Sequence, residues 1–322
     1  MIGRRSLLDS DLDQQQILRS QDWNWDDPVW KSDDIARSVF DGVGTRAGVD
    51  DLVRWPGAGG DTMISVDRTS PADFTIPVRN GSGGAAPASS GSGLITTYNA
   101  GIADGEAGYD IRIDFTGTGW TADLQKAFKD AADYFTKVIT RDIGGGAYYG
   151  GIYVDDLYMT AELRTIDGAG GILGQAGPSS IWNSTELTAR GKMQFDSADA
   201  LSYLKKGTWD DIVTHEMMHV LGFGSLWNFG KNPLVTAPGQ YTGKAGLAAY
   251  QAAGHSGASF IPVETDGGPG TAGAHWDEQA LGNELMTGYI NNSNYLSSFS
   301  LMSLADLGYA AQPLPWPGSL VS

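Results

Sequence analysis

Cysteine is absent from this sequence of 322 residues. Its absence excludes disulfide bonds, thiolate ligands for zinc and control of a site by thiol chemistry. A metal site in this chain therefore has to be built from histidine nitrogens and carboxylate oxygens.

Basic residues are also scarce: 21 Lys and Arg stand against 38 Asp and Glu, which gives a net charge of −17 and a pI near 4.4. A surface of this sign repels nucleic acid and anionic membranes, so we expect neither as a partner. Grouped carboxylates can instead hold hard cations such as Ca²⁺. The adjacent pairs Asp26–Asp27 and Asp155–Asp156 are the candidates for a calcium site.

Long apolar runs are missing as well. No stretch of about 18 apolar residues occurs, so we expect no membrane-spanning segment. The first 20 residues include the pair Arg4 and Arg5 but lack the apolar core of a Sec signal peptide. Secretion by a route without such a signal and cytoplasmic residence are both compatible with this sequence.

The most informative feature present is an H-E-x-x-H motif formed by His215, Glu216 and His219, in a chain with only four histidines. Residues four apart lie on one face of an α-helix, so both imidazoles can bind one zinc ion. Glu216 can reach a zinc-bound water without being a ligand, which suits a general base. A catalytic zinc needs three protein ligands, so the chain has to supply a third.

Periodic patterns surround this motif. A stripe of apolar residues predicts a helix over 121–140 with Thr121 as N-cap, and the motif itself predicts a helix over 208–221 that ends at Gly222. The Gly-rich residues 167–178 predict bulges or an irregular sheet edge. Strands are expected at residues 109–115, 152–154, 158–163 and 191–195. Together these elements indicate a layered α/β or α+β fold.

The residues from His215 to Gly222, H-E-M-M-H-V-L-G, resemble the metzincin zinc proteases, in which the helix ends at that glycine. Most metzincins carry a third histidine where this chain has Ser225. Leishmanolysin-like metzincins place a long insertion before theirs, and this chain has His275, 56 residues after His219 (275 − 219). The segments 262–276 and 282–288 are also similar to that subfamily.

The resemblance implies an α+β metzincin-type fold: a mixed twisted sheet, a backing helix, an active-site helix and an irregular C-terminal subdomain. It implies that His215, His219 and His275 bind one Zn²⁺, that Glu216 is the general base and that Met286 belongs to the Met-turn. The implied activity is zinc-dependent endopeptidase cleavage of extended peptide or protein substrates. The resemblance further implies a monomeric, secreted bacterial-type protein made as a zymogen.

Composition and the resemblance together divide the chain. Residues 1–92 are an N-terminal segment that ends in a Gly-, Ser- and Ala-rich linker, with a pro-segment as one role and a long surface loop as the alternative for the linker. Residues 93–222 are the N-terminal catalytic subdomain with the zinc helix. Residues 223–322 are the C-terminal subdomain with the insertion, the third ligand and the Met-turn. Asp41 is a candidate latency residue, although a solvated turn aspartate is the simpler and favoured explanation.

Substrate peptides are expected to add as a strand to the edge at residues 170–178. Tyr289 is interpreted as a wall of the pocket beyond the zinc, and His255 as an exposed loop residue.

Two alternatives to the endopeptidase stay open. A gluzincin-like exopeptidase would use an acidic third ligand from Glu264, Glu278 or Glu284, although Glu284 is better suited to orienting neighbours of the ligands or capping its turn. A non-catalytic zinc-containing binding protein would keep the metal site for stability alone. Such a protein has no use for Glu216.

Overall fold

The computed structural model describes residues 93–317, apart from 102–107, 145, 170–172, 183, 230–231, 267–269 and 292. Before residue 93 it describes only two short strands, β1 (Ile17–Leu18) and β2 (Thr62–Met63). The predictions for Asp26–Asp27, for Asp41 and for the linker therefore lie outside the described residues.

A twisted sheet forms the first layer. Five strands run in the order β3 (Thr97–Ala100), β4 (Ile111–Gly117), β7 (Leu157–Arg164), β9 (Thr188–Asp196) and β8 (Gly174–Trp182). Strands β4, β7 and β9 are parallel, and β3 and β8 lie antiparallel at the two sides. Buried and partly exposed residues alternate along β7, as a sheet with one face on the core requires. The mixed sheet expected from the sequence is confirmed.

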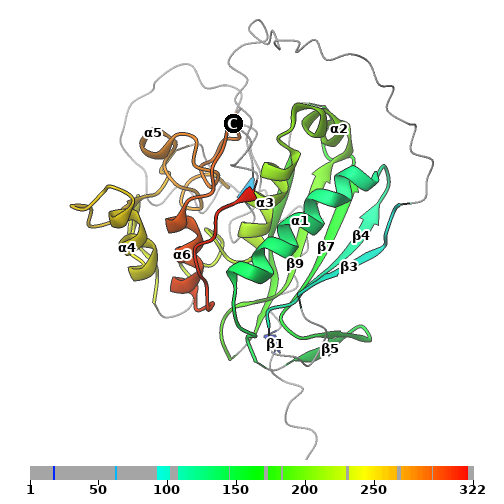
Figure 1. The fold of residues 1–322 in the computed structure, drawn as a ribbon, viewed down its shortest axis with the longest axis horizontal. Helices are drawn as coiled ribbons and strands as arrows, with labels where there is room; N and C mark the ends of the chain where they lie inside the picture. The colour runs from blue at the N-terminus through cyan, green and yellow to red at the C-terminus, as the bar shows by residue number, and fades with distance from the viewer. Residues whose placement is uncertain are drawn as a thin grey trace, which may run out of the picture.

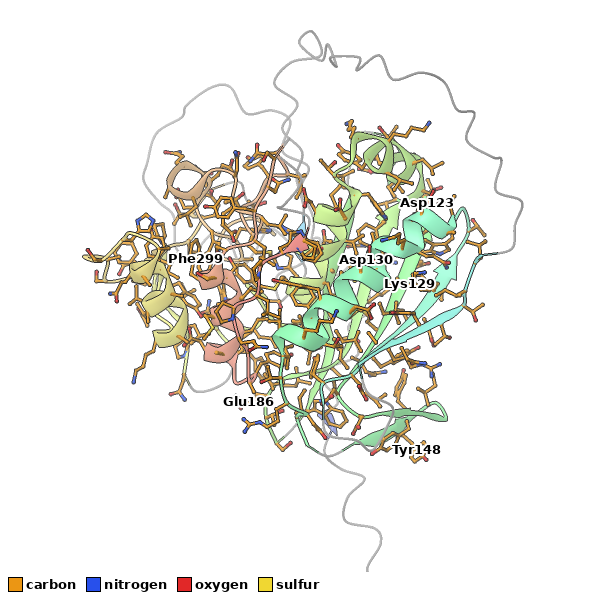
Figure 2. The ribbon with its side chains drawn as sticks, in the orientation of Figure 1. Asp123, Lys129, Asp130, Tyr148, Glu186 and Phe299 are labelled. Atoms are coloured by element: carbon orange, nitrogen blue, oxygen red, sulfur yellow. The ribbon has the colours of Figure 1, made fainter. Side chains whose placement is uncertain are left out.

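Helix α1 (Ala122–Val138) backs this sheet. The side chain of Thr121 accepts a hydrogen bond from the backbone N–H of Leu124 and so caps the helix, as predicted. The apolar stripe, which includes Phe128 and Phe135, is fully buried, whereas Asp123 and Asp130 lie on the exposed face (Figure 2). Burial of this one face fixes the helix on the sheet.

Helix α3 (Trp209–Val220) lies beside α1 over the same layer (Figure 1), and α2 (Ser197–Lys206) connects it to β9. Eleven of its twelve residues are buried, Asp210 being the exception. A helix that is buried on nearly all sides lies in the interior of the protein. Helix α3 therefore places the H-E-x-x-H motif between the sheet and the C-terminal part of the chain.

The C-terminal part is mostly irregular. It contains α4 (Lys244–Ala252), α5 (Glu278–Leu281), α6 (Ser298–Leu307) and a small sheet of β10 (Val235–Ala237), β11 (Gln240–Tyr241) and β12 (Ile261–Pro262). Its core is aromatic: Trp276 packs on Trp227 with ring centroids 4.8 Å apart and on Phe223 at 5.0 Å. This cluster joins the chain that leaves α3 to the chain that carries His275.

Strand β8 begins inside the Gly-rich stretch for which bulges or an irregular edge were predicted. It is a strand of nine residues, and its register with β9 shifts between Pro178 and Ser180 and again between Ser180 and Ile181. Its outer side is paired antiparallel with both β1 and β2. Pairing with β9 on one side and with β1 and β2 on the other supplies the backbone hydrogen bonds of this strand.

A short hairpin of β5 (Ala147–Tyr149) and β6 (Ile152–Val154) projects from the base of the sheet, with Tyr148 exposed (Figure 2). Strand β4 begins at Ile111 rather than at Tyr109, because its register with β7 starts at the pair Ile111 and Leu157. None of the described helices is both long and apolar enough to cross a membrane.

Candidate metal centre

Helix α3 presents His215 and His219 on one face, and the chain then turns at Gly222. The helix ends as predicted: Gly222 has φ +107°, and a Cβ there would lie 2.9 Å from Leu226 Cδ1 and 3.0 Å from Leu307 Cδ1. Only glycine fits both that left-handed backbone and that space.

The third histidine reaches the helix through close backbone contact. Gly224 has φ +68°, and a Cβ there would lie 2.0 Å from the carbonyl oxygen of Ala274. The carbonyl of His275 accepts a hydrogen bond from the N–H of Glu264 at 2.9 Å, which secures the segment from its other side. A second glycine after the helix is therefore what lets His275 approach.

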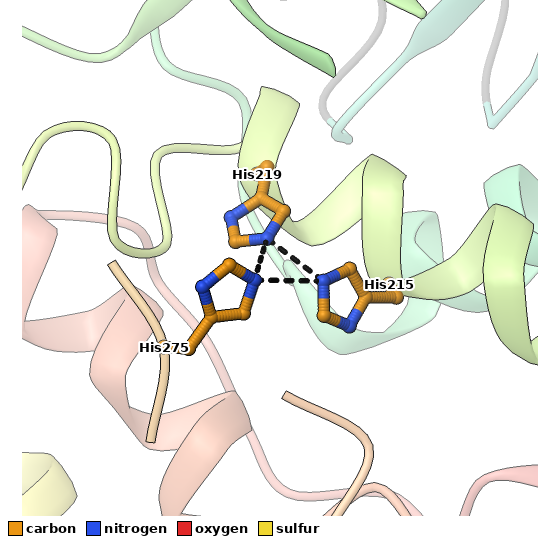
Figure 3. A group of neighbouring side chains, drawn as sticks. All are labelled: His215, His219 and His275. Carbon is orange, nitrogen blue, oxygen red and sulfur yellow. Dashed lines mark hydrogen bonds between the residues drawn. The ribbon is translucent and has the colours of Figure 1, made fainter. Parts of the chain in front are cut away.

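The three Nε2 atoms converge (Figure 3). They are separated by 2.9 Å between His215 and His219, and by 3.1 Å from each of these to His275. All three side chains have no exposed surface. Among the described residues, this is the group of histidine or acidic side chains whose ligand atoms come close enough together to hold a metal ion.

Backbone carbonyls decide the tautomer of each ring. Nδ1 of His215 lies 2.7 Å from the carbonyl oxygen of Leu285, Nδ1 of His219 lies 2.9 Å from that of Phe223, and Nδ1 of His275 lies 3.1 Å from that of Thr271. A carbonyl oxygen only accepts, so each neutral ring carries its proton on Nδ1. The three Nε2 lone pairs then face one another. They repel one another unless a cation lies between them.

Burial keeps the rings neutral. Desolvation, followed by the charge of the neighbouring histidines, lowers the pKa of His215 and His219 well below the ordinary value. Desolvation lowers the pKa of His275 to about 4, although the Thr271 carbonyl acts in the opposite direction. Neutral imidazole is the form that binds metal.

The donor set fits zinc. Three imidazole nitrogens this close together can all lie about 2.0–2.1 Å from one ion, and three protein ligands leave a fourth position for water or substrate. The carbonyls behind the rings provide the orienting hydrogen bonds usual for zinc-binding histidines.

Glu216 lies close to the start of β8. It is fully buried, and a Cβ built on Gly174 would lie 3.3 Å from its Oε1 atom. The first residue of the outer strand therefore faces the proposed base directly. Sequence reasoning missed Gly174, whose only signal was its place in a Gly-rich stretch.

Met286 is fully buried in the turn after α5. Its carbonyl accepts a hydrogen bond from the N–H of Trp276 at 3.0 Å, and the preceding carbonyl, that of Leu285, holds His215. The segment implied to be the Met-turn thus contacts two of the three ligand-bearing segments through its backbone. The assignment of Met286 to a Met-turn stays a prediction.

The acidic alternatives for a third ligand lie elsewhere. Glu264 accepts hydrogen bonds from the N–H groups of Thr265, Asp266 and Glu278. Glu284 accepts them from Met286, Ser297 and Ser300. Glu278 bonds to Asn291. None of the three joins the converging histidines, so the metal-binding group that the structure assembles is the histidine one.

Ser225 and His255, the other two positions considered, are both outside the triad. The hydroxyl of Ser225 donates to the carbonyl of His219 at 2.7 Å and so helps to close the end of the helix. His255 is exposed, as predicted, and its ring stacks on Tyr250 with centroids 3.9 Å apart. Tyr289 is partly buried after the Met286 turn, and its role as a pocket wall stays a prediction.

Asp155 and Asp156, the calcium candidates within the described residues, are both buried. The Asp156 carboxylate accepts hydrogen bonds from the N–H groups of Asp110 and Ile143, each at 2.7 Å. These bonds occupy part of its acceptor capacity. A calcium ion at this pair stays a prediction.

Comparison with known proteins agrees with this centre. The family model described as leishmanolysin matches residues 156–313. Over these residues the chain belongs to the leishmanolysin family. The residues that match the leishmanolysin model include α3, Met286 and the three histidines of the triad.

A relative named as a leishmanolysin homolog, from Crithidia fasciculata, is 33% identical over 107 residues. The aligned part is 30% of this chain and 16% of that relative, so the chain corresponds to a small share of the relative's length. The similarity to this relative thus covers a part of each chain and not the whole molecule.

Proposed function

We propose that this chain is a zinc-dependent endopeptidase that hydrolyses peptide bonds in extended protein substrates. The observation that carries the proposal is the convergence of three buried, neutral imidazole Nε2 atoms next to Glu216, in a chain of the leishmanolysin family. A metal site kept only for stability would gain nothing from a buried glutamate beside it.

The chemistry follows from the donor set. Zinc held by His215, His219 and His275 would polarise a water molecule and the carbonyl group of the substrate. Glu216 accepts a proton from that water as its oxygen attacks the carbonyl carbon, and it then delivers the proton to the amide nitrogen as the C–N bond breaks. The carbonyls of Leu285, Phe223 and Thr271 hold the three rings in place throughout.

The outer side of β8 is the proposed place for the substrate backbone. Strand β8 begins at Gly174 beside Glu216, and the antiparallel pairs that β8 makes with β1 and β2 support its ability to accept an extended segment there. Strand addition gives affinity through backbone hydrogen bonds and leaves side-chain choice to pockets.

Residues 1–92 are proposed to act as a pro-segment at the same edge. Thr62 pairs with Ala176 and Met63 with Gln175, directly after Gly174. A segment of the chain itself that occupies this edge would compete with substrate. This route to latency needs neither a cysteine nor Asp41.

Digestion of an unfolded protein such as casein, with and without a chelator, tests the endopeptidase proposal. We expect cleavage at internal bonds, loss of cleavage when the metal is removed and recovery when zinc is returned. Peptides with blocked ends separate an endopeptidase from an exopeptidase, since only the endopeptidase cleaves them.

Glu216→Gln is the decisive variant. It keeps the size of the side chain but removes the base, so we expect zinc to bind normally and cleavage to fall by about 100-fold or more. Full cleavage by this variant would refute the mechanism. Zinc binding by the wild type without any cleavage would favour a non-catalytic binding protein instead.

A further inference from the structure

Glu284 is a buried carboxylate with three hydrogen-bond donors. It has no exposed surface. Its Oε2 atom accepts from the N–H of Met286 at 2.5 Å, and its Oε1 atom accepts from the N–H of Ser297 at 2.9 Å and the hydroxyl of Ser300 at 2.6 Å. A carboxyl group this deeply buried is costly unless its oxygens are hydrogen-bonded, and here both oxygens are.

One arm of this network leads to the first histidine through a single peptide unit. The N–H of that unit belongs to Met286 and donates to Glu284, and its C=O belongs to Leu285 and accepts from Nδ1 of His215 at 2.7 Å. A peptide unit is planar, so fixing its N–H also fixes the direction of its C=O. An oxygen acceptor at the N–H end polarises the unit and strengthens the carbonyl as an acceptor for the imidazole proton.

The other arm leads to the segment of the third histidine. The Ser300 hydroxyl that donates to Glu284 accepts in turn from Nε1 of Trp276 at 2.7 Å. Trp276 follows His275 in the chain, and its backbone N–H donates to the carbonyl of Met286 at 3.0 Å. The Glu284 side chain is therefore linked by hydrogen bonds to the peptide that binds His215 and to the residue that follows His275. None of these hydrogen bonds joins it to a histidine directly.

We infer that Glu284 is a positioning residue of the metal centre, which orients His215 through the Leu285–Met286 peptide and His275 through Ser300 and Trp276. This inference rests on the proposed zinc function but concerns metal binding rather than hydrolysis. Residues that orient zinc-binding histidines contribute about 10–100-fold to metal affinity.

Glu284→Gln tests the inference. The amide keeps the size of the side chain, but in either orientation its NH₂ group faces at least one backbone N–H, that of Met286 or that of Ser297. We expect the dissociation constant for zinc, measured by competition with a chelator of known affinity, to rise by about 10–100-fold. The visible absorption of the cobalt(II)-substituted protein, which reports ligand geometry, should change as well.

Asp196→Asn is the matched control. Asp196 is also a buried acidic residue, and its side chain accepts from four backbone N–H groups, but none of these belongs to a peptide unit bound to a ligand ring. We expect this variant to lose thermal stability while zinc affinity and the cobalt spectrum stay near those of the wild type. A Glu284→Gln protein that behaves in the same way would overturn the inference.

Ser300→Ala is the second variant, and it tests the inference even if the Glu284→Gln protein does not fold. It leaves the carboxylate and the Leu285–Met286 arm in place and removes only the link to Trp276. We expect a smaller rise in the zinc dissociation constant, of about 10-fold. An unchanged constant would overturn the inference. Because every readout is metal binding, a wild-type protein that binds zinc without cleaving peptides would refute the proposed function and leave the role of Glu284 standing.

Discussion

Gly174 and Glu216 face each other across the boundary between strand β8 and helix α3. A Cβ at Gly174 would lie 3.3 Å from Oε1 of Glu216 and 2.9 Å from Cδ1 of Phe195. The missing side chain leaves room for the carboxylate beside the strand at which a substrate is proposed to bind. Small shifts of a catalytic base have large effects on rate, so this contact is open to a direct test.

Gly174→Ala is expected to lower peptide cleavage by about 10- to 100-fold, because the methyl group must displace either the Phe195 ring or the Glu216 carboxylate. Zinc content should be unchanged, since no ligand is touched. Gly257→Ala is the control: a Cβ there has no heavy atom within 4 Å. Equal turnover by the two variants would show that the space at Gly174 does not matter.

His275→Ala is expected to remove zinc. Loss of a residue that only orients a ligand costs about 10–100-fold in metal affinity, so loss of the ligand itself should cost more. The measurement is the ratio of zinc to protein after dialysis. His255→Ala, at the exposed histidine stacked on Tyr250, is the matched control and should retain one zinc per chain. Full zinc content in His275→Ala would contradict the assigned ligand set.

Replacing both Thr62 and Met63 by proline is expected to raise peptide cleavage severalfold. Proline has no N–H and cannot donate to a neighbouring strand, so β2 should leave the outer side of β8. Alanine at the same two positions keeps the backbone donors and serves as the control. If the proline and alanine proteins cleave at the same rate, the N-terminal segment does not block the edge through this pairing.

Asp156 is expected to make stability depend on pH. Burial raises its pKa to about 7, although the N–H groups of Ile143 and Asp110 act in the opposite direction. The folded protein then binds one more proton than the unfolded chain between about pH 4 and 7. The stabilising contribution of the protonated group is complete below about pH 4 and is lost as the pH rises through about 7.

Urea denaturation of the wild type between pH 4.5 and 8 measures this effect. The midpoint should fall as the pH rises, and Asp156→Asn, which cannot ionise, should show a weaker dependence over the same range. Identical slopes for the two proteins would mean that Asp156 is already ionised in the fold at the acid end of that range.

The local features of the centre could be predicted from the sequence, because short spacings determine them. The interval of four between His215 and His219 places both rings on one face of a helix, and Gly222 ends that helix because of its left-handed backbone. The stripe of α1 and its cap at Thr121 follow from the same kind of local rule. His275 was reached differently, since only a family resemblance connects residues 56 apart (275 − 219).

Tertiary structure alone decided the rest. The tautomer of each histidine depends on the carbonyls of Leu285, Phe223 and Thr271. Every residue has a backbone carbonyl, so the sequence does not mark which ones accept these hydrogen bonds. The pairing of β8 depends on strands from distant parts of the chain, and the space at Gly174 depends on two other elements. The H-E-x-x-H motif determined the type of chemistry proposed for this protein, because it supplies two metal ligands and a base. Long-range backbone contacts, which no local pattern encodes, decided how its ligands and base are held.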